Sequence, residues 1–283
     1  MGTRDVLLLV IALAAGACVG SFVNVVITRL PVAFDEPNEF GDLWGTQGWS
    51  VVAEGESHCD GCGRELTIGD LVPVLSWLVL RGRCRTCGAP IPAHHPLVEL
   101  LVPALGALAW WRIGWGWQLG PVLWAVPVLV AVSAIDLRTL IVPTRIVRPA
   151  TAILAALIVV GSVASHHPQW MLRALIGVAV LAGPLFLIWF VRPGGMGFGD
   201  VRLAVFLGAL VGWRSVDGGP AAPLLLAVVC IGIAAVVGIV IGVAALGARG
   251  RQAKVPFGPA LAVAAFVCCL EAGPILDAFA IGR

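Results

Sequence analysis

Residues 221–247 read AAPLLLAVVCIGIAAVVGIVIGVAALG and contain no charged side chain. A transmembrane α-helix needs about 20 consecutive apolar residues to cross the hydrocarbon core of a bilayer. This run is long enough, and in a water-soluble domain a helix that is apolar all round would have to be buried on every side. The stretch therefore predicts a membrane-spanning helix and decides the environment in which the rest of the chain is interpreted.

Runs of the same character recur along the chain. Hydrophobic residues make up 59% of it and charged residues 12%, and the mean hydropathy is +0.99. So few charges cannot cover the surface of a soluble protein of this size, which favours a polytopic membrane protein surrounded by lipid. We predict an all-α bundle of about eight transmembrane helices. The predicted helices cover residues 6–28, 97–111, 121–135, 149–164, 171–190, 201–213, 221–247 and 256–279.

One long polar stretch, residues 29–96, interrupts this pattern. The chain thus divides into a first transmembrane helix (1–28), an aqueous insertion (29–96) and a transmembrane bundle (97–283). Most of the 18 Lys and Arg residues fall in the insertion and in every second loop after it. Cytoplasmic loops are the ones enriched in Lys and Arg, so the insertion is expected in the cytoplasm. The net charge of +2 and the lack of a basic run argue against nucleic acid as a partner.

Four of the eight cysteines form two Cys-x-x-Cys pairs, and each pair is followed at once by glycine. They are Cys59, Cys62, Cys84 and Cys87. This spacing turns two thiolates toward one point, and four thiolates complete the tetrahedral shell of a structural Zn²⁺ ion. The alternative is two disulfides, which a reducing cytoplasm disfavours. The sequence therefore predicts a small cytoplasmic zinc-binding insertion.

Acidic residues at membrane depth are few. Of the 16 in the chain, nine fall in the insertion and four map to the outer side, which leaves Glu99, Asp136 and Asp200 at the cytoplasmic boundary. Ionisable groups at that depth are costly to desolvate, so each is a candidate functional residue. The chain has no His-Glu-x-x-His and no Gly-x-Ser-x-Gly motif, which disfavours metalloprotease and serine hydrolase chemistry.

Asp136 ends an apolar run, and Asp200 directly follows the glycine-rich segment GGMGFG at 194–199. Each has a structural alternative, a helix-end aspartate beside Arg138 and an N-cap aspartate after a turn. As a pair they suit an aspartic dyad, because close like charges keep one carboxyl protonated while the other takes a proton from water. The glycines predicted to let a substrate strand approach the backbone are Gly195, Gly197 and Gly199.

The segment GMGFGDVR at 195–202 resembles the Gly-x-Gly-Asp signature of type IV prepilin peptidases, and Asp136 followed by Val142-Pro143 resembles their first catalytic aspartate. Two departures are small, since Arg202 stands where the family usually has Lys and His95 where it usually has Tyr. Nearly the whole chain takes part in the resemblance. Further matching segments are GSFVNVV at 20–26, the two Cys-x-x-Cys pairs, DLVPVLSW at 70–77, PLVE at 96–99 and PFGP at 256–259.

The resemblance implies a multi-pass enzyme of the bacterial cytoplasmic membrane that cleaves the leader of prepilins and pseudopilins after a glycine, with its active site facing the cytoplasm. In that family the enzyme then methylates the new N-terminal amine with S-adenosylmethionine, and members that lack the cysteine-bearing insertion generally lack this second activity. A bifunctional enzyme is therefore expected, with Glu99 as a candidate for methyl transfer or amine positioning. No segment of the sequence marks the S-adenosylmethionine site.

Two other classes of protein stay open at this point. A proton- or ion-coupled transporter would use Asp136 and Asp200 as its ion site. A non-enzymatic assembly factor of a secretion system would use the zinc-binding insertion to dock a partner, and it would tolerate the loss of either aspartate.

Overall fold

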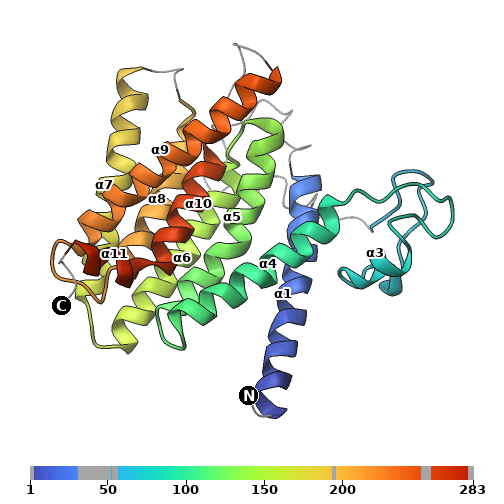
Figure 1. Cartoon of the computed structure of the whole chain (residues 1–283), viewed down its shortest axis with the longest axis horizontal. Helices are drawn as coiled ribbons and strands as arrows, with labels where there is room; N and C mark the ends of the chain where they lie inside the picture. The colour runs from blue at the N-terminus through green and yellow to red at the C-terminus, as the bar shows by residue number, and fades with distance from the viewer. Residues whose placement is uncertain (1–2, 31–51, 53–56, 193–195, 250–255, 280–283) are drawn as a thin grey trace. The chain divides into compact units, whose positions relative to one another are not determined.

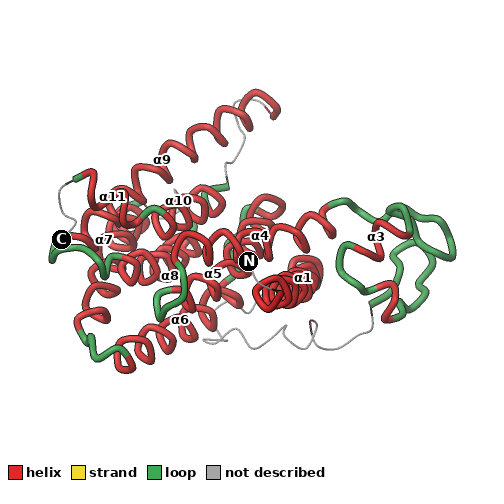
Figure 2. Tube along the Cα trace, turned by 60° about the horizontal axis from the view of Figure 1, so that its bottom comes forward, coloured by secondary structure: helices red, strands yellow, loops and turns green. Residues whose placement is uncertain are grey.

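The structure of the 283-residue chain is a computed structural model that describes residues 3–30, 52, 57–192, 196–249 and 256–279. It divides into two compact units, Met1–Leu108 and Ala109–Arg283 (Figure 1). Within the described ranges the regular elements are helices, with two isolated β-bridges and no strand (Figure 2). The predicted all-α class is therefore confirmed.

The N-terminal unit contains α1 (Thr3–Arg29), the short helices η2 (Ile68–Asp70) and α3 (Leu75–Val79), and most of α4 (His94–Ile113). Glycines on α1 allow it to touch α4. A Cβ added at Gly16 would lie 2.8 Å from Cβ of Pro103, and one added at Gly20 would lie 2.8 Å from Cα of Glu99. Small residues permit this close approach of membrane helices. The two helices, which flank the cysteine-bearing segment in the sequence, therefore touch at these two glycines.

The C-terminal unit is a helix bundle in which consecutive helices run alternately up and down in Figure 1. Its helices are α5 (Leu119–Thr139), α6 (Thr144–Ala164), α7 (Gln169–Val191), α8 (Phe198–Arg214), α9 (Ala222–Arg249), α10 (Gly258–Leu270) and α11 (Ala272–Ala278). Helix α8 packs against α6, α7, α9 and α10. Side chains such as Phe206, Leu210 and Trp213 are completely buried there, so the core lies along α8.

Six helices of the described chain are long and apolar enough to span a membrane, namely α1, α4, α5, α6, α7 and α9. The pair α10 and α11, bent by 78°, would make a seventh span. A helix occurs at each of the eight predicted ranges, but α8 has only 17 residues. Large apolar side chains such as Phe190, Val191 and Val240 are exposed, as expected for helices in contact with lipid.

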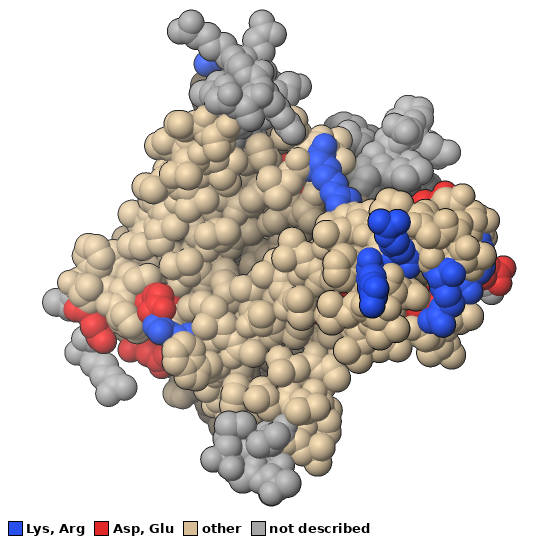
Figure 3. Space-filling view, turned by 45° about the vertical axis from the view of Figure 1, so that its right-hand side comes forward, with Lys and Arg blue, Asp and Glu red and all other residues tan. Residues whose placement is uncertain are grey.

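Charged side chains avoid these apolar surfaces. On the face shown in Figure 3, Lys and Arg gather over the cysteine-bearing part of the N-terminal unit. The exposed arginines of that part include Arg81, Arg83 and Arg85. Enrichment in Lys and Arg is the feature from which the sequence predicts that this segment lies in the cytoplasm.

The crossing of α7 and α8 depends on glycine. A Cβ at Gly208 would lie 2.6 Å from the carbonyl oxygen of Gly177, and a Cβ at Gly177 would collide with the carbonyl oxygen of Gly208. Because backbone atoms cannot move aside cheaply, we expect Gly177→Val to lower the free energy of unfolding by about 3 kcal/mol. The measurement is the unfolding midpoint in detergent.

Gly183 is the matched control, since it lies on the same helix and an added Cβ would have no neighbour within 4 Å. Gly183→Val should leave the midpoint close to that of the unchanged protein. Equal loss of stability in the two variants would show that the glycine contact between α7 and α8 does not determine the packing.

Candidate active site and metal centre

Asp136 lies in the last turn of α5 and is only 3% exposed. Its Oδ2 accepts a hydrogen bond of 2.9 Å from the backbone N–H of Gly258, the first residue of α10. The N–H groups at a helix N-terminus lack partners in the helix and favour a nearby carboxylate. Helix α5 ends at Thr139, and the left-handed φ of 57° at the following residue, Leu140, turns the chain away from the helix axis. The carboxyl group is thus held between the end of one helix and the start of another.

Asp200 lies in the first turn of α8 and is partly buried. The chain enters this helix through Gly197, whose extended ψ of 140° brings its carbonyl oxygen to the N–H of Asp200 at 3.2 Å. The carboxyl group of Asp136 acts electrostatically on that of Asp200. The end of α5 and the start of α8 therefore bring the two predicted aspartates to one end of the bundle.

The predicted substrate-binding glycines have different surroundings. A Cβ at Gly199 would lie 2.9 Å from Cβ of Val142, so this glycine allows the start of α8 to pack against the α5–α6 connection. A Cβ at Gly197 would lie 3.6 Å from Oδ2 of Asp200, which is an ordinary contact distance. Gly195 lies outside the described residues. Of the two described glycines, Gly197 is the one at which an added Cβ would contact an aspartate side chain.

Arg202 connects α8 to α6 at the same end of the bundle. From α8 it donates a hydrogen bond to Thr144 Oγ1 at the start of α6. Its guanidinium lies 4.7 Å from the ring centre of Phe198, close enough for a cation–π interaction. The positive charge next to Asp200 in the sequence is thus directed toward α6.

The four predicted cysteine ligands come together in the N-terminal unit. The Sγ atoms of Cys59, Cys62, Cys84 and Cys87 all lie within 4.8 Å of one another. The Sγ atoms of Cys59 and Cys87 are 3.8 Å apart. With Zn–S bonds of about 2.3 Å, the edge of a tetrahedral site is about 3.8 Å long. The geometry of this cluster therefore fits a tetrahedral metal ion.

Both cysteine pairs adopt the same turn. In the first, the N–H of Gly63 donates to Cys59 O, and in the second the N–H of Gly88 donates to Cys84 O. Both glycines have a left-handed φ, of 67° and 71°, which side chains disfavour. In the second turn, hydrogen bonds from the backbone N–H groups of Cys87 and Thr86 lower the pKa of the Cys84 thiol to about 6. These hydrogen bonds thus favour the thiolate form of Cys84, which is the form that binds a metal.

Comparison with known proteins identifies the family. Residues 14–113 match the bacterial peptidase A24 N-terminal domain, and residues 123–243 match the type IV leader peptidase family. The chain belongs to the type IV leader peptidase family. Both cysteine turns lie in the first matched range, and Asp136 and Asp200 lie in the second. The resemblance noted in the sequence is thereby confirmed.

Curated relatives in this family are similar over most of their length. A prepilin leader peptidase/N-methyltransferase of Xanthomonas campestris pv. campestris is 34% identical, over 95% of this chain and 93% of the relative. Proteins with the same description from Stutzerimonas stutzeri and Pseudomonas aeruginosa are 33% and 31% identical, over 92% and 90% of this chain and 89% and 87% of the relatives. No solved structure matches the chain.

The leader peptidase fold also contains a residue that sequence reasoning assigned no role. Asp70 bridges the two cysteine turns, because it pairs with Arg64 at 2.6 Å and with Arg85 at 3.1 Å. The hydroxyl of Thr67 also donates to it at 2.8 Å, and this bond is the main reason why the pKa of Asp70 falls to about 2. In the sequence, Asp70 lies between Arg64 and Arg85, the arginines beside the two cysteine turns, and this pattern could have pointed to an ion pair. Sequence spacing alone does not show which acidic residue these arginines contact.

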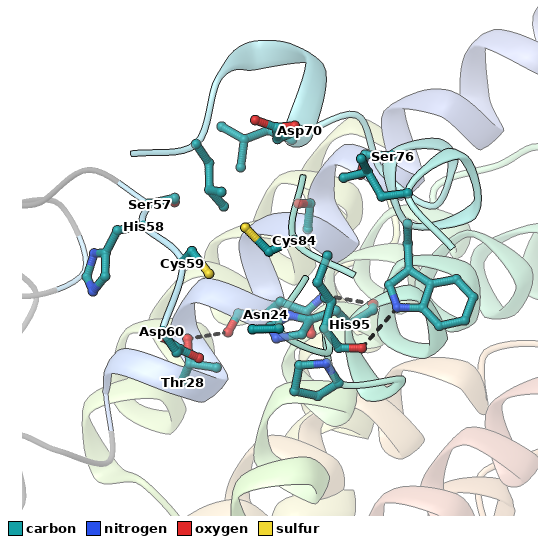
Figure 4. Close-up of a pocket in the computed structure, with 18 of the residues that line it drawn as sticks. Asn24, Thr28, Ser57, His58, Cys59, Asp60, Asp70, Ser76, Cys84 and His95 are labelled. Carbon is teal, nitrogen blue, oxygen red and sulfur yellow. Dashed lines mark hydrogen bonds between the residues drawn. The ribbon is translucent and has the colours of Figure 1, made fainter. Parts of the chain in front are cut away.

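Glu99, the third predicted carboxylate, belongs to the N-terminal unit of this leader peptidase. Its Oε2 accepts a 2.7 Å hydrogen bond from the backbone N–H of Val74, a residue with a left-handed φ of 61°. It also lines a cavity of about 910 Å³ beside the cysteine turns (Figure 4). The structure thus groups Glu99 with the cysteine-bearing segment, whereas Asp136 and Asp200 belong to the C-terminal unit.

Proposed function

We propose that this chain is a prepilin leader peptidase and N-methyltransferase in which Asp136 and Asp200 together cleave the leader. Family membership and the curated relatives favour this function over a transporter or a non-enzymatic assembly factor. The observation that supports the residue assignment is that Asp136, in the last turn of α5, and Asp200, in the first turn of α8, lie at the same end of the helix bundle and are buried and partly buried. We infer that this end faces the cytoplasm of a bacterium, in accordance with its basic loops.

The arrangement suits the activation of water. Two close carboxyl groups hold one proton between them, since both cannot ionise together. The ionised group takes a proton from water as it attacks the carbonyl carbon of the scissile peptide bond. The protonated group donates to the developing oxyanion, and a proton then passes to the leaving nitrogen. The N–H of Gly258 fixes the Asp136 carboxyl group for this exchange.

The cysteine cluster supports a structural Zn²⁺ ion. Four sulfur ligands complete its shell, so they leave no position at which water could be activated. Asp70 holds the two turns in register through Arg64 and Arg85. The ion would join two loops that have few apolar residues of their own, and so stabilise a segment too small to form a large core.

The second reaction in the proposed function is methylation of the amine that cleavage exposes. S-adenosylmethionine supplies the methyl group, and Glu99 is a candidate for positioning the amine. We infer that prepilins or pseudopilins are the substrates, because the curated relatives are described as prepilin leader peptidases.

A synthetic leader peptide tests the whole proposal. Incubated with the purified enzyme and S-adenosylmethionine, the peptide is expected to be cut after the leader glycine and then to gain the mass of one methyl group, as measured by mass spectrometry. Proton flux in proteoliposomes without any cut peptide would instead favour the transporter. An inactive but correctly folded, zinc-loaded protein would favour the assembly factor.

Gly258 offers a test of how Asp136 is positioned. A Cβ at this glycine would lie 2.8 Å from Asp136 Oδ2, so Gly258→Val should displace the carboxyl group. We expect cleavage to slow about a hundredfold, because small misplacement of a reacting group is costly. The measurement is the initial rate of leader cleavage.

Gly232→Val is the matched control, because a Cβ at Gly232 in α9 has no neighbour within 4 Å. It should cleave at nearly the rate of the unchanged enzyme. If Gly258→Val also cleaves at that rate, the contact between Gly258 and Asp136 does not contribute to catalysis.

A further inference from the structure

The cavity in the N-terminal unit has the size and lining of a cofactor site. Its volume is about 910 Å³, and small-molecule sites are commonly about 300–1,000 Å³. Its walls come from α1, the start of α4, helix α3 and both cysteine turns (Figure 4). Apolar side chains such as Leu66, Leu80 and Ile91 lie beside polar and charged ones. This mixture is typical of sites that bind a ligand with apolar and polar parts.

Helix α1 contributes a polar stripe to this cavity. The lining residues from α1 are Ser21, Asn24, Val25, Thr28 and Arg29, which follow the three- and four-residue spacing of one helix face. Four of the five are polar, although the segment around them is apolar. Polar side chains in a membrane helix usually face a cavity or partner rather than lipid. A polar ligand in the cavity would therefore explain why these polar side chains lie on one face of an apolar helix.

Asn24 is the member of the stripe whose side-chain nitrogen has a hydrogen-bond partner while its side-chain oxygen has none among the described residues. Its side chain is buried, with the residue 4% exposed, and its Nδ2 donates to His95 O at 2.9 Å. Its Oδ1 is buried and has no hydrogen-bond partner among the described residues. A buried acceptor without a donor is unfavourable, so a donor group supplied by a bound ligand or a water would stabilise this oxygen. In Figure 4 Asn24 lies beside His95 and near Cys84 at the wall of the cavity.

Two further residues in the cavity lining suit a ligand that carries both a positive charge and a nucleobase. Glu99 places a carboxylate in the cavity wall, and Oε2 of that carboxylate is already fixed by Val74. Trp77 also lines the cavity, with its indole N–H bonded to Ile91 O at 3.1 Å, which orients the ring. An aromatic ring favours stacking with a nucleobase, and a carboxylate favours a positively charged group.

We propose that this cavity binds S-adenosylmethionine and that Asn24 Oδ1 accepts a hydrogen bond from an N–H or O–H group of it. The inference rests on the proposed N-methyltransferase function, and it gives that function a place in the chain. The cofactor combines an adenine ring, hydroxyl and ammonium donors and a sulfonium cation, which are the groups that this lining complements.

Methyl transfer at this site would exchange an S–C bond for an N–C bond. The lone pair of the new N-terminal amine forms the N–C bond to the methyl carbon, and the S–C bond breaks with its electron pair remaining on sulfur. The proton that the alkylated nitrogen must lose passes to a base. Glu99 lines the same cavity and supplies a carboxylate for that proton.

The test measures binding rather than turnover. Full-length, zinc-loaded enzyme in detergent is titrated with S-adenosylhomocysteine in a calorimeter, for the unchanged protein and for Asn24→Leu. Loss of a buried hydrogen bond and its acceptor should weaken affinity about tenfold or more. Cys18→Ser is the control, because Cys18 lies on α1 but does not line the cavity, and it should bind normally. Photo-crosslinking with labelled cofactor should mark residues 21–29 or 91–99.

Folding is checked separately through zinc content and melting temperature. If Asn24→Leu fails to hold zinc, Ser21→Leu takes its place, since it fills the cavity from the same helix face and should weaken binding to the same degree. Normal affinity in a folded variant, or crosslinks confined to residues 109–283, would overturn the inference. If the unchanged enzyme cleaves and methylates the peptide in that case, the proposed function survives; if it does neither, the function itself has failed.

Discussion

Changing Asp136 or Asp200 to asparagine is expected to lower the rate of leader cleavage by about a thousandfold or more. Asparagine keeps the size of the side chain and can still accept the Gly258 N–H at position 136. It cannot take a proton from water or share one with its partner, so the chemical step loses its acid–base pair. The rate is measured by mass spectrometry of a leader peptide under single-turnover conditions.

Glu99→Gln is the matched control for this prediction, since it removes a carboxyl group from the other unit of the chain. That variant should still cleave the leader. All three variants should retain zinc and an unchanged melting temperature. The assignment of the dyad would be refuted if Glu99→Gln abolished cleavage while either aspartate variant remained active.

Removal of zinc is expected to have the second largest effect. Structural zinc sites contribute about 10–16 kcal/mol of binding free energy in small isolated domains. In this chain the ion would connect two turns that otherwise meet through the Asp70 ion pairs. We therefore expect Cys84→Ser, or treatment with a strong chelator, to expose residues 57–92 to limited proteolysis and to abolish methylation.

The measurement combines metal analysis with the rate of proteolysis in that segment. Cys18→Ser, which removes a thiol outside the cluster, should retain one zinc ion and full protection. If Cys84→Ser kept its protection and its methylation activity after complete loss of zinc, the ion would not be the element that holds the segment together.

Most of the helical fold could be predicted from apolar runs, because a helix in lipid must hide its backbone polar groups within itself. The limits of this reasoning are visible near Glu271. The predicted run 256–279 is one apolar segment, yet it forms α10 and α11 with a bend of 78° between them. Composition measures whether a segment can lie in the membrane, but it does not measure the packing that bends it. The burial of the short helix α8 is a similar result of packing.

The candidate site was predictable where chemistry restricted the choice. Cysteine spacing identified the cluster, and elimination of the other acids left Glu99, Asp136 and Asp200, of which the two aspartates form the predicted pair. The contact between Asp136 and Gly258 was not predictable, because it joins residues 122 positions apart. Asp70 and Asn24 were missed for the same reason. Their roles depend on hydrogen bonds across the fold rather than on any local pattern.

The central claim is that Asp136 and Asp200 act as one catalytic unit. Single-turnover cleavage by Asp136→Asn, by Asp200→Asn and by the double variant tests it most directly, because losses within one unit do not add. If the two carboxyl groups act as one unit, the double variant will cleave no more slowly than either single variant. Losses that multiply in the double variant would mean that the two carboxyl groups work independently, and this would contradict the account.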